Sequence, residues 1–272
     1  MEPWNNLPGK VVLVTGASSG LGRELCLDLA KAGCLIIAAA RRVDRLNSLC
    51  DEINQTNELP STKTVVFVEL DVTSKENKIV EAVQKALDAF GRIDVLINNA
   101  GYRGSISSVI DISQEEWDRT MKTNLDGQWL VAKSVMAHMI KTRIAGSIIN
   151  ISSTAGLNRV LAPGSVSYVN SKSALHALTK VMSLEMGRYG IRVNAIAPGI
   201  FQSEITEELF KKKWLTNIER KGVPLKKFVQ ANPGLTSLIR YLIHDSSYYI
   251  SGNVFIVDSG YSLPGFPLFS SL

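Results

Sequence analysis

The 272-residue sequence contains few cysteines and histidines and no long hydrophobic run. Its three cysteines, Cys26, Cys34 and Cys50, are widely spaced among apolar neighbours, which predicts packed, reduced thiols instead of disulfides. The three histidines are scattered, with no Cys or His nearby at ligand spacing, so we expect no metal site. No apolar run approaches the ~20 residues of a membrane span, and we expect no membrane partner.

The start of the sequence also lacks a visible targeting signal. Residues 1–6 carry neither a basic segment with an apolar core nor an Arg- and Ser-rich pattern, so we expect a cytoplasmic protein. The net charge is only +5, and the basic residues are mostly dispersed between acids. A nucleic-acid partner is therefore not expected, because such proteins carry a basic stripe with interleaved aromatic residues.

Strand-like apolar runs alternate with helical patterns along the whole chain. We predict strands at residues 10–15, 34–40, 64–70, 93–97, 147–151, 191–197 and 252–257. Continuous β-branched runs are typical of strands buried on both faces. The alternation predicts an α/β fold with a doubly wound parallel sheet and helices on both faces. Without a linker or a repeat, residues 1–272 are expected to form one domain.

A glycine-rich turn, Gly16-Ala-Ser-Ser-Gly20-Leu-Gly22, follows the first predicted strand and opens a helix. Gly16 permits the tight turn, Gly20 lets the backbone approach a pyrophosphate, and Gly22 lets the helix pack close to the strand. The exposed N–H groups at the helix start then bind phosphates. Glycines as plain turn residues are the alternative, but the order of strand, turn and helix favours a dinucleotide site.

The residues after the second strand, Ala40-Arg41-Arg42, indicate which dinucleotide binds. In dinucleotide folds, a residue ~20 positions beyond the glycines meets the adenosine ribose, and an acid there favours NAD. No carboxylate occurs here before Asp44. Because a guanidinium can bind a 2′-phosphate with paired hydrogen bonds, we predict NADP(H) as the cofactor. The alternative is that both arginines merely flank the next helix.

Polar residues also stand where later strands end. Asp71 could accept a hydrogen bond from the adenine amine, and it could equally cap the next helix with Thr73. Asn98-Asn-Ala-Gly101 can hold the central sheet and leave room beside the cofactor, with a simple turn as the alternative. Asn124 lies inside the helical region 113–142, where it predicts a bend and a buried polar group.

Tyr168 and Lys172 stand four residues apart at the start of a helical pattern, so they share one helix face. An ammonium beside a phenol stabilises its anion, and we therefore expect the pKa of Tyr168 to be lowered toward neutrality. Such a tyrosine can exchange protons with a carbonyl or an alcohol. Taken alone the spacing is weak evidence of a catalytic pair, because surface helices produce it freely and a half-buried tyrosine beside a solvated lysine is the far commoner cause.

Near the end of the chain, residues 203–230 lose periodicity and gain charge. This insertion is expected to be a substrate lid, and a solvated surface excursion is the alternative. Pro233 is expected in the first turn of a last helix. The apolar tail 262–272 is expected to pack on a partner subunit or over a cleft, because exposed apolar tails are costly.

Together these motifs resemble the short-chain dehydrogenase/reductase family, in its single-domain branch, over nearly the whole chain. Thr15–Gly22 is similar to the family's cofactor motif, and Asn98–Gly101 is similar to its sheet-stabilising motif. Pro198-Gly199 and Asp258-Ser-Gly260 also fit. The sequence is most similar to 3-oxoacyl-carrier-protein reductase-like members of the family, and it also resembles plant members. The resemblance implies a Rossmann-type sheet of about seven parallel strands.

The resemblance also implies catalytic roles for four residues in the family's chain order. Tyr168 would be the general acid that protonates the carbonyl oxygen. Lys172 would hold the nicotinamide ribose and lower the pKa of Tyr168. Ser153 would polarise the carbonyl, with Ser152 as the alternative, since the family usually uses the second serine. Asn124 would hold a water that links Lys172 to solvent.

A cofactor-binding set follows from the same resemblance. Ser18, Arg41 and Arg42 would meet the 2′-phosphate, and Ile200 and Ser203 would meet the carboxamide. The other expected cofactor residues are Gly16, Ser19, Gly20, Leu21, Gly22, Asp71, Val72, Asn98, Ala100, Gly101, Tyr168, Lys172, Pro198 and Gly199.

Two departures from the family pattern concern the substrate side and the chain end. Ser153 and Tyr168 lie 15 positions apart (168 minus 153), about two more than is common in the family, so the loop 156–166 is expanded. That loop lines the substrate side, which weakens any inference about the substrate but not about the chemistry. Asp258-Ser-Gly260 replaces Asp-Gly-Gly, a change we expect to be mild.

The leading prediction is an NADPH-dependent ketoreductase that converts a ketone of a small organic or acyl substrate to the secondary alcohol. The alternatives are an NAD(P)-dependent alcohol dehydrogenase working in the oxidative direction and a cofactor-binding protein without turnover. Recognition of an acyl carrier through Lys211–Lys213 and Lys226-Lys227 is a further alternative. We expect a homodimer or homotetramer formed through the helices that contain Asn124 and Tyr168.

Overall fold

Seven parallel strands form one sheet in the order β3-β2-β1-β4-β5-β6-β7. The computed structural model describes residues 2–55, 64–157, 161, 163–201, 207–228 and 230–263. The strands are β1 (Val11–Thr15), β2 (Leu35–Ala40), β3 (Val65–Glu69), β4 (Val95–Asn98), β5 (Ser147–Ile151), β6 (Arg192–Pro198) and β7 (Val254–Val257). Every neighbouring pair is parallel, which confirms the Rossmann-type doubly wound α/β fold.

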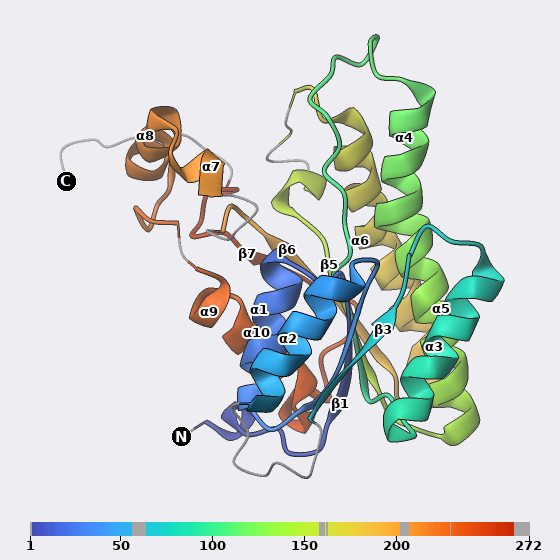
Figure 1. Ribbon diagram of the computed structural model, residues 1–272. Coiled ribbons are helices and arrows are strands. Elements are labelled where there is room, and N and C mark those ends of the chain that lie inside the picture. The colour runs from blue at the N-terminus through green and yellow to red at the C-terminus, as the bar shows by residue number, and fades with distance from the viewer. Residues whose placement is uncertain are drawn as a thin grey trace.

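Helices cover both faces of the sheet (Figure 1). On one face lie α1 (Gly20–Lys31), α2 (Val43–Gln55) and α10 (Thr236–Ile243), and on the other lie α3 (Glu76–Phe90), α5 (Gly127–Thr142) and α6 (Val166–Met186). The shorter helices are α4 (Gln114–Met121), α7 (Glu207–Phe210), α8 (Lys213–Gly222) and α9 (Ala231–Gly234). Within the described part of the chain, the helices are all too short or too polar to span a membrane.

The central strand β1 shows why its sequence is apolar throughout. Val12 and Val14 pack against α1, α2 and α10, whereas Val11 and Leu13 pack toward α3 and α5. All four side chains are at most 1% exposed. Successive side chains of a strand point to opposite faces, so a strand covered on both faces has no position for a polar residue.

The helical region expected over residues 113–142 is interrupted at the predicted bend. Between α4 and α5 the backbone forms a π-helical turn over Lys122–Asp126, and the N–H of Gly127 bonds to the carbonyl of Lys122. Asn124 lies in this turn and is completely buried. Single π turns inside α-helices are typical of functional sites.

The last helix begins later than the sequence suggests. Helix α10 begins at Thr236, whereas Pro233 was expected in its first turn. Asn232, inside α9, has φ −101° and ψ 123°, which is an extended conformation. A residue before proline is disfavoured in the helical region, and this restriction kinks α9 at Asn232, ahead of α10.

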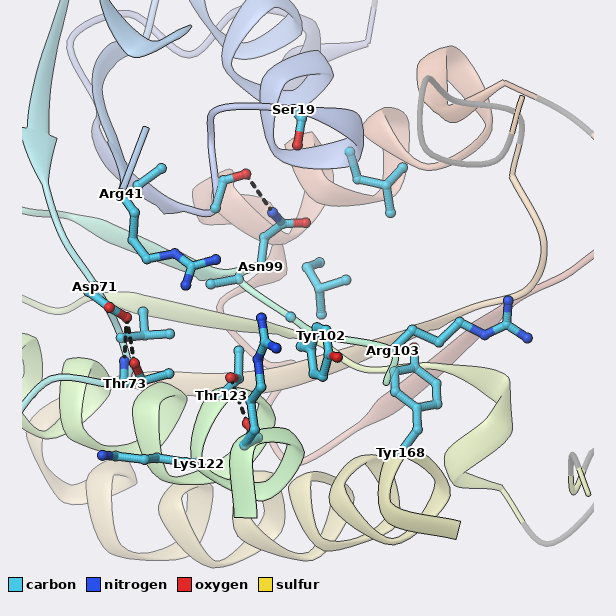
Figure 2. Close-up of a pocket in the computed structure, with 18 of the residues that line it drawn as sticks. Ser19, Arg41, Asp71, Thr73, Asn99, Tyr102, Arg103, Lys122, Thr123 and Tyr168 are labelled. Atoms are coloured by element: carbon cyan, nitrogen blue, oxygen red, sulfur yellow. Dashed lines mark hydrogen bonds between the residues drawn. The ribbon is translucent and has the colours of Figure 1, made fainter. Parts of the chain in front are cut away.

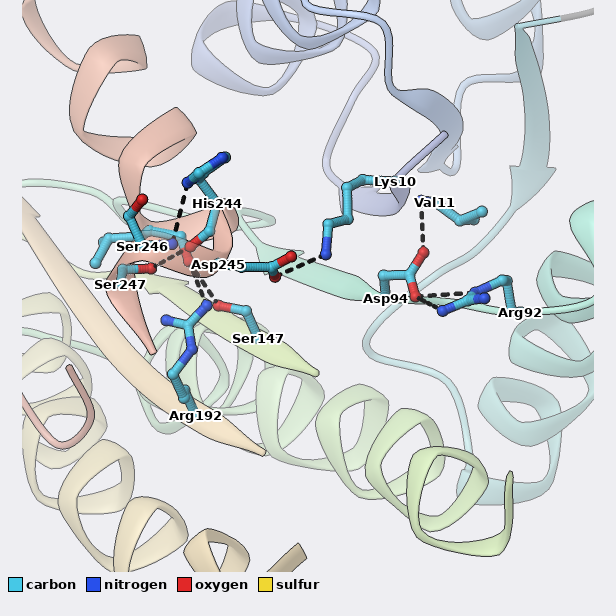
Figure 3. A network of polar contacts seen from close by, with 11 residues as sticks. Lys10, Val11, Arg92, Asp94, Ser147, Arg192, His244, Asp245, Ser246 and Ser247 are labelled. Carbon is cyan, nitrogen blue, oxygen red and sulfur yellow. Dashed lines mark hydrogen bonds and ion pairs between the residues drawn. The ribbon is translucent and has the colours of Figure 1, made fainter. Parts of the chain in front are cut away.

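A polar network ties the amino ends of the strands together, at the edge of the sheet shown in Figure 3. Asp94 accepts hydrogen bonds from the backbone N–H of Val11 at 2.9 Å and from Arg92 Nε at 2.9 Å. Lys10 pairs with Asp245 at 2.8 Å, and Arg192 donates to the carbonyl of Leu242 at 2.8 Å. These contacts fix the starts of β1, β4 and β6.

A buried ion pair joins α1 to α10. Arg240 donates to both carboxylate oxygens of Asp28 at 2.7 Å and to the Asp28 carbonyl at 3.1 Å. The two side chains are 17% and 3% exposed, in that order. A bidentate pair of this kind, between a guanidinium and a carboxylate, holds α1 and α10 in one fixed relative orientation.

Substitution of Asp28 by Asn should lower the free energy of unfolding by about 3 kcal/mol, because the Arg240 guanidinium stays buried without its carboxylate. The matched control is Glu52→Gln, which removes the pair between Glu52 and Arg23 that is 45% and 39% exposed. That change should cost less than about 1 kcal/mol. Urea unfolding followed by circular dichroism measures both, and equal small losses would show that the buried pair contributes no special stability.

Candidate active site

A cavity of about 990 Å³ opens at the carboxyl ends of the central strands (Figure 2). It lies where the strand order reverses between β1 and β4. Open α/β sheets bind ligands at such a switch point. The predicted site residues that line it are Gly16, Ser18, Ser19, Leu21, Arg41, Arg42, Asp71, Val72, Ala100, Gly101, Ser153, Tyr168, Lys172, Pro198 and Gly199.

The floor of the cavity is a clamp between the ends of β1 and β4. The hydroxyl of Thr15 accepts hydrogen bonds from the N–H groups of Asn99 and Ala100, both at 3.0 Å. The Asn99 amide in turn donates to the carbonyls of Thr15 at 3.0 Å and Gly16 at 3.4 Å. A Cβ atom at Gly22 would collide with the Gly16 carbonyl and lie 2.5 Å from Asn99 Nδ2. Glycine at 22 therefore allows the close packing that its motif predicts.

Basic and hydroxyl groups gather at one end of the cavity. Arg42 donates to the hydroxyl of Ser18 at 2.9 and 3.1 Å and to that of Ser19 at 2.6 Å. The guanidinium of Arg41 extends into the cavity beside them (Figure 2). A 2′-phosphate fits this group, because two guanidinium ions and a serine hydroxyl can surround its oxygens.

Asp71 lines the same end and caps its own turn. Its Oδ1 accepts from the N–H of Thr73 at 2.9 Å and from the Thr73 hydroxyl at 2.8 Å. These bonds close a turn at Thr73 but do not cap α3, whose N-cap residue is Lys75 and has no side-chain cap, so the capping role considered from the sequence is wrong. These bonds use one carboxylate oxygen, and Figure 2 shows Asp71 at the cavity wall.

Asn98 is not at the cavity, where the sequence placed it. Its side chain is buried and donates to the carbonyl of Gln128 and to Asn150 Oδ1, both at 3.0 Å. Asn150 continues this chain to the Thr179 hydroxyl on α6 at 3.0 Å. Neighbouring residues at the end of a strand face opposite sides. Asn98 therefore points into the core, and Asn99 faces the cavity.

Ser153, Tyr168 and Lys172 lie together at the other end of the cavity. The Ser153 side chain lies close enough to the Tyr168 hydroxyl to lower its pKa, and Ser153 Oγ accepts from the Ala155 N–H at 3.1 Å. Lys172 is 3% exposed, and its ammonium donates to the carbonyl of Ile151 at 2.8 Å. The same ammonium lies 5.9 Å from the centroid of the Tyr168 ring. Helix α6 thus brings both residues to one face, as their spacing predicts.

The expected lowering of the Tyr168 pKa is wrong for this arrangement. Burial raises the pKa of Tyr168, and the nearby Ser153 side chain and the charge of Arg103 offset only part of that rise. Burial also lowers the pKa of Lys172 to about 8. The sequence argument counted the attraction between phenolate and ammonium but not the loss of water around them.

Asn124 does not line the cavity, and its side chain is occupied by protein groups. Its Oδ1 accepts from the Tyr102 N–H at 2.7 Å, and its Nδ2 donates to the Tyr102 carbonyl at 2.8 Å and to Ser171 Oγ at 3.0 Å. Ser171 in turn donates to the Tyr168 carbonyl at 2.8 Å. Asn124 therefore connects the loop after β4 to the first turns of α6.

Ser152 and Ser153 have separate environments. Ser152 Oγ lies 2.7 Å from Nε2 of His176 and donates to the Lys172 carbonyl at 3.3 Å. Burial and the charge of Lys172 lower the pKa of His176 to about 4, so the ring is neutral at physiological pH. Ser152 therefore anchors the end of β5 to α6, and Ser153 faces Tyr168.

Some site residues differ from the predicted set. Gly20, Gly22 and Ile200 are described but do not line the cavity, and Ser203 lies outside the described residues. Two further cavity residues, Asn99 and Ser152, were named from the sequence as part of the Asn98–Gly101 motif and as the alternative to Ser153. The cavity residues outside the predicted set are Ala40, Leu70, Thr73, Tyr102, Arg103, Glu115, Asp118, Arg119, Lys122, Thr123 and Ile151. Tyr102, Arg103, Glu115, Asp118 and Arg119 lie on α4 or in the loop before it, in a stretch for which the sequence predicted no site residue.

Comparisons with known proteins agree with this geometry. The family model for short chain dehydrogenase matches residues 10–214. A 3-oxoacyl-[acyl-carrier-protein] reductase of Thermotoga maritima is 37% identical, over 93% of this chain and 98% of its own. Glucose 1-dehydrogenase 2 of Bacillus subtilis is 31% identical, over 96% and 97%. A gluconate 5-dehydrogenase from Burkholderia cenocepacia, solved with NADP and tartrate, has a TM-score of 0.87, 28% identity and coverage of 96% and 98%.

Burial of Lys172 has a consequence for stability that depends on pH. Its pKa in the folded protein, about 8, lies below the ordinary lysine value of 10.5. Below pH 8 the folded protein carries the full cost of a buried ammonium, and between pH 8 and 10.5 the unfolded chain binds more protons, so this cost disappears as pH rises.

Substitution of Lys172 by Met should therefore stabilise the nucleotide-free protein at pH 7 by about 2 kcal/mol, after allowing for the lost bond to Ile151. The advantage over wild type should shrink between pH 8 and 10.5. Lys180→Met, an exposed lysine on the same helix, is the control and should leave the pH dependence unchanged. Chemical unfolding across this pH range measures the effect. A destabilised Lys172→Met protein at pH 7 would contradict the argument.

Proposed function

The chain belongs to the short-chain dehydrogenase/reductase family, and on that premise we propose that it is an NADP(H)-dependent carbonyl reductase. It reduces a ketone of a small organic or acyl substrate to the secondary alcohol. The observation that carries the proposal is the Ser153–Tyr168 pair at one end of a cavity whose other end presents Arg41. A proton donor and a phosphate-binding cation then share one elongated site.

The choice of NADP(H) rests on the end of β2. Arg41 and Arg42 follow this strand at the position where an NAD site uses a carboxylate. Arg42 is held by Ser18 and Ser19, so the guanidinium is fixed before any cofactor arrives. The solved relative that contains NADP supports the same choice. Asp71 has a carboxylate oxygen at the cavity wall that can accept from the adenine amine.

When bound, NADPH supplies the hydride that the carbonyl carbon of the substrate accepts. Ser153 donates a hydrogen bond to the carbonyl oxygen and holds it beside Tyr168. Tyr168 then transfers its phenolic proton to that oxygen, so the alkoxide is neutralised as it forms. Lys172, whose ammonium is directed by the Ile151 carbonyl, would hold the nicotinamide ribose and replace the proton on Tyr168.

The protonation state of Tyr168 favours the reductive direction. Its raised pKa keeps the phenol protonated at neutral pH, and reduction needs a proton donor. Oxidation of an alcohol would need the phenolate, which burial disfavours. The oxidative dehydrogenase therefore stays the second candidate. We also propose that Asn124, which lies in the π turn, holds a water for proton supply, as the family resemblance implies.

We also propose that the chain is one domain with a substrate lid at about 203–230. Helices α7 and α8 stand apart from the helices that cover the sheet, at the upper left of Figure 1. Leu215 and Val223 of this region are nonetheless buried, at 2% and 0% exposure. A segment anchored by few buried side chains can open without disturbing the core.

A homodimer or homotetramer in the cytoplasm is the assembly we propose. Large apolar side chains are exposed on α5 and α6, namely Trp129 at 43%, Val181 at 51% and Leu184 at 84%. Apolar groups gathered on neighbouring helices mark a protein–protein interface. The helices that carry the catalytic residues would then also form the contact between subunits.

Substitution of Tyr168 by Phe should reduce kcat for ketone reduction by about 10²- to 10⁴-fold, because no other group at the carbonyl oxygen can donate the proton. The dissociation constant for NADPH, measured by fluorescence, should change by less than about threefold, since the ring is retained. A kcat within a few-fold of wild type would contradict the assignment of Tyr168 as the acid.

Substitution of Arg41 by Asp should lower kcat/KM with NADPH by about 100-fold and raise it with NADH, because a carboxylate repels the 2′-phosphate and can accept from a ribose hydroxyl. Arg143→Asp is the control, since Arg143 caps the end of α5 in a left-handed conformation that Asp tolerates. In this control, the ratio of kcat/KM with NADPH to kcat/KM with NADH should stay unchanged. An unaltered ratio in Arg41→Asp would show that Arg41 does not select the cofactor.

A further inference from the structure

Arg103 stands at the catalytic end of the cavity, in the loop that follows β4. In Figure 2 its side chain lies beside Tyr168, and Arg41 lies on the opposite side of the view. The cofactor's phosphate end and Arg103 are thus separated by the proton donor. The space next to Arg103 is the space that a substrate would occupy.

The backbone around Arg103 is held firmly, although its side chain is exposed. The residue before it, Tyr102, is fixed on both its N–H and its carbonyl by Asn124. Two residues after it, the N–H of Ser105 donates to Glu116 at 2.6 Å. The Arg103 side chain therefore projects from a rigid part of the loop, at a fixed position beside Tyr168.

The guanidinium of Arg103 has no hydrogen bond or ion pair within the described part of the chain. Three of the other cations that line the cavity are engaged, whereas Arg41 lies at the phosphate end and Lys122 on the π turn. Arg42 bonds to two serines, Arg119 lies 4.3 Å from the centroid of the Tyr102 ring, and Lys172 bonds to a carbonyl. The nearby carboxylate of Glu116 is used by Ser105 and the Tyr102 hydroxyl. A fixed but uncompensated cation in a cleft is a site for an anion.

We propose that Arg103 binds an oxyanion of the substrate, a carboxylate or a phosphate, while Ser153 and Tyr168 hold its ketone. The planar guanidinium matches either oxyanion with paired hydrogen bonds. This inference rests on the proposed function and narrows its substrate class to oxo acids and phosphorylated ketones. The anion would also reduce the effect of Arg103 on the pKa of Tyr168 and so keep the proton on the phenol.

Two matched substrate pairs test the proposal. The carboxylate pair is acetoacetate and ethyl acetoacetate, and the phosphate pair is dihydroxyacetone phosphate and dihydroxyacetone. For each pair, the ratio of kcat/KM for the charged ketone to that for the neutral ketone is measured with NADPH. Arg103→Leu should lower this ratio at least about tenfold for one pair, and Arg103→Lys should lower it less, because a lysine keeps the charge but loses the paired geometry. The pair that responds identifies the oxyanion.

The ratio also separates direct binding from an effect on Tyr168. Any change in the Tyr168 pKa alters charged and neutral ketones alike and cancels in the ratio. Arg119→Leu removes a neighbouring cavity cation that is already stacked on Tyr102, and it should leave both ratios within about twofold. Equal losses in Arg119→Leu and Arg103→Leu would attribute the preference to the general field of the cavity and overturn the assignment of Arg103.

Different results would overturn the role of Arg103 and the reductase assignment. Both ratios could stay within about threefold in Arg103→Leu while the neutral ketones are reduced. Arg103 would then not bind an oxyanion, but the reductase assignment would stand. Absence of NADPH binding to the wild-type protein, measured by fluorescence, would overturn the proposed function and this inference with it. Unfolding curves show that the variants are folded.

Discussion

The clamp between the ends of β1 and β4 is the contact on which the site depends. Thr15 and Asn99 exchange hydrogen bonds through side chain and backbone, and Gly22 has no Cβ that would force them apart. The neighbouring strand order reverses at this point, so the clamp also forms the floor of the cleft. Arg41 on one side and Tyr168 on the other are held at a fixed separation because their strands and helices are attached to this floor.

The catalytic groups are held at a cost in stability that other parts of the fold offset. Lys172 is a buried cation whose acceptor in the structure is the Ile151 carbonyl, and Tyr168 is a phenol in surroundings that disfavour its anion. Such groups persist where the surrounding structure is strong enough to hold them. Here the support comes from two apolar clusters on the faces of the sheet and from the Arg240–Asp28 pair.

Features that depend on sequence neighbours could be predicted, and features that depend on packing could not. All seven strands and the shared face of Tyr168 and Lys172 follow from local periodicity. Whether Asn98 or Asn99 faces the cavity depends on which way the last residues of β4 turn, and the sequence spacing does not reveal this direction. The direction of the Tyr168 pKa depends on how much water is lost, which only the packed structure shows. Arg103 lies on a loop without periodicity, so its position had no signal in the sequence.

The π turn at Lys122–Asp126 has a consequence for the orientation of the two helices that it connects. A π turn holds one residue more than the α-helix it interrupts, and one residue rotates a helix by about 100°. Deleting a residue there would leave α5 seated on the sheet but swing α4 round by that angle. Arg119 would then leave the Tyr102 ring, and Glu116 would leave the loop that carries Arg103. The extra residue thus sets the rotation of α4, which shapes the substrate side, relative to α5, which packs in the core. Relatives with and without it would differ in specificity while keeping the same chemistry.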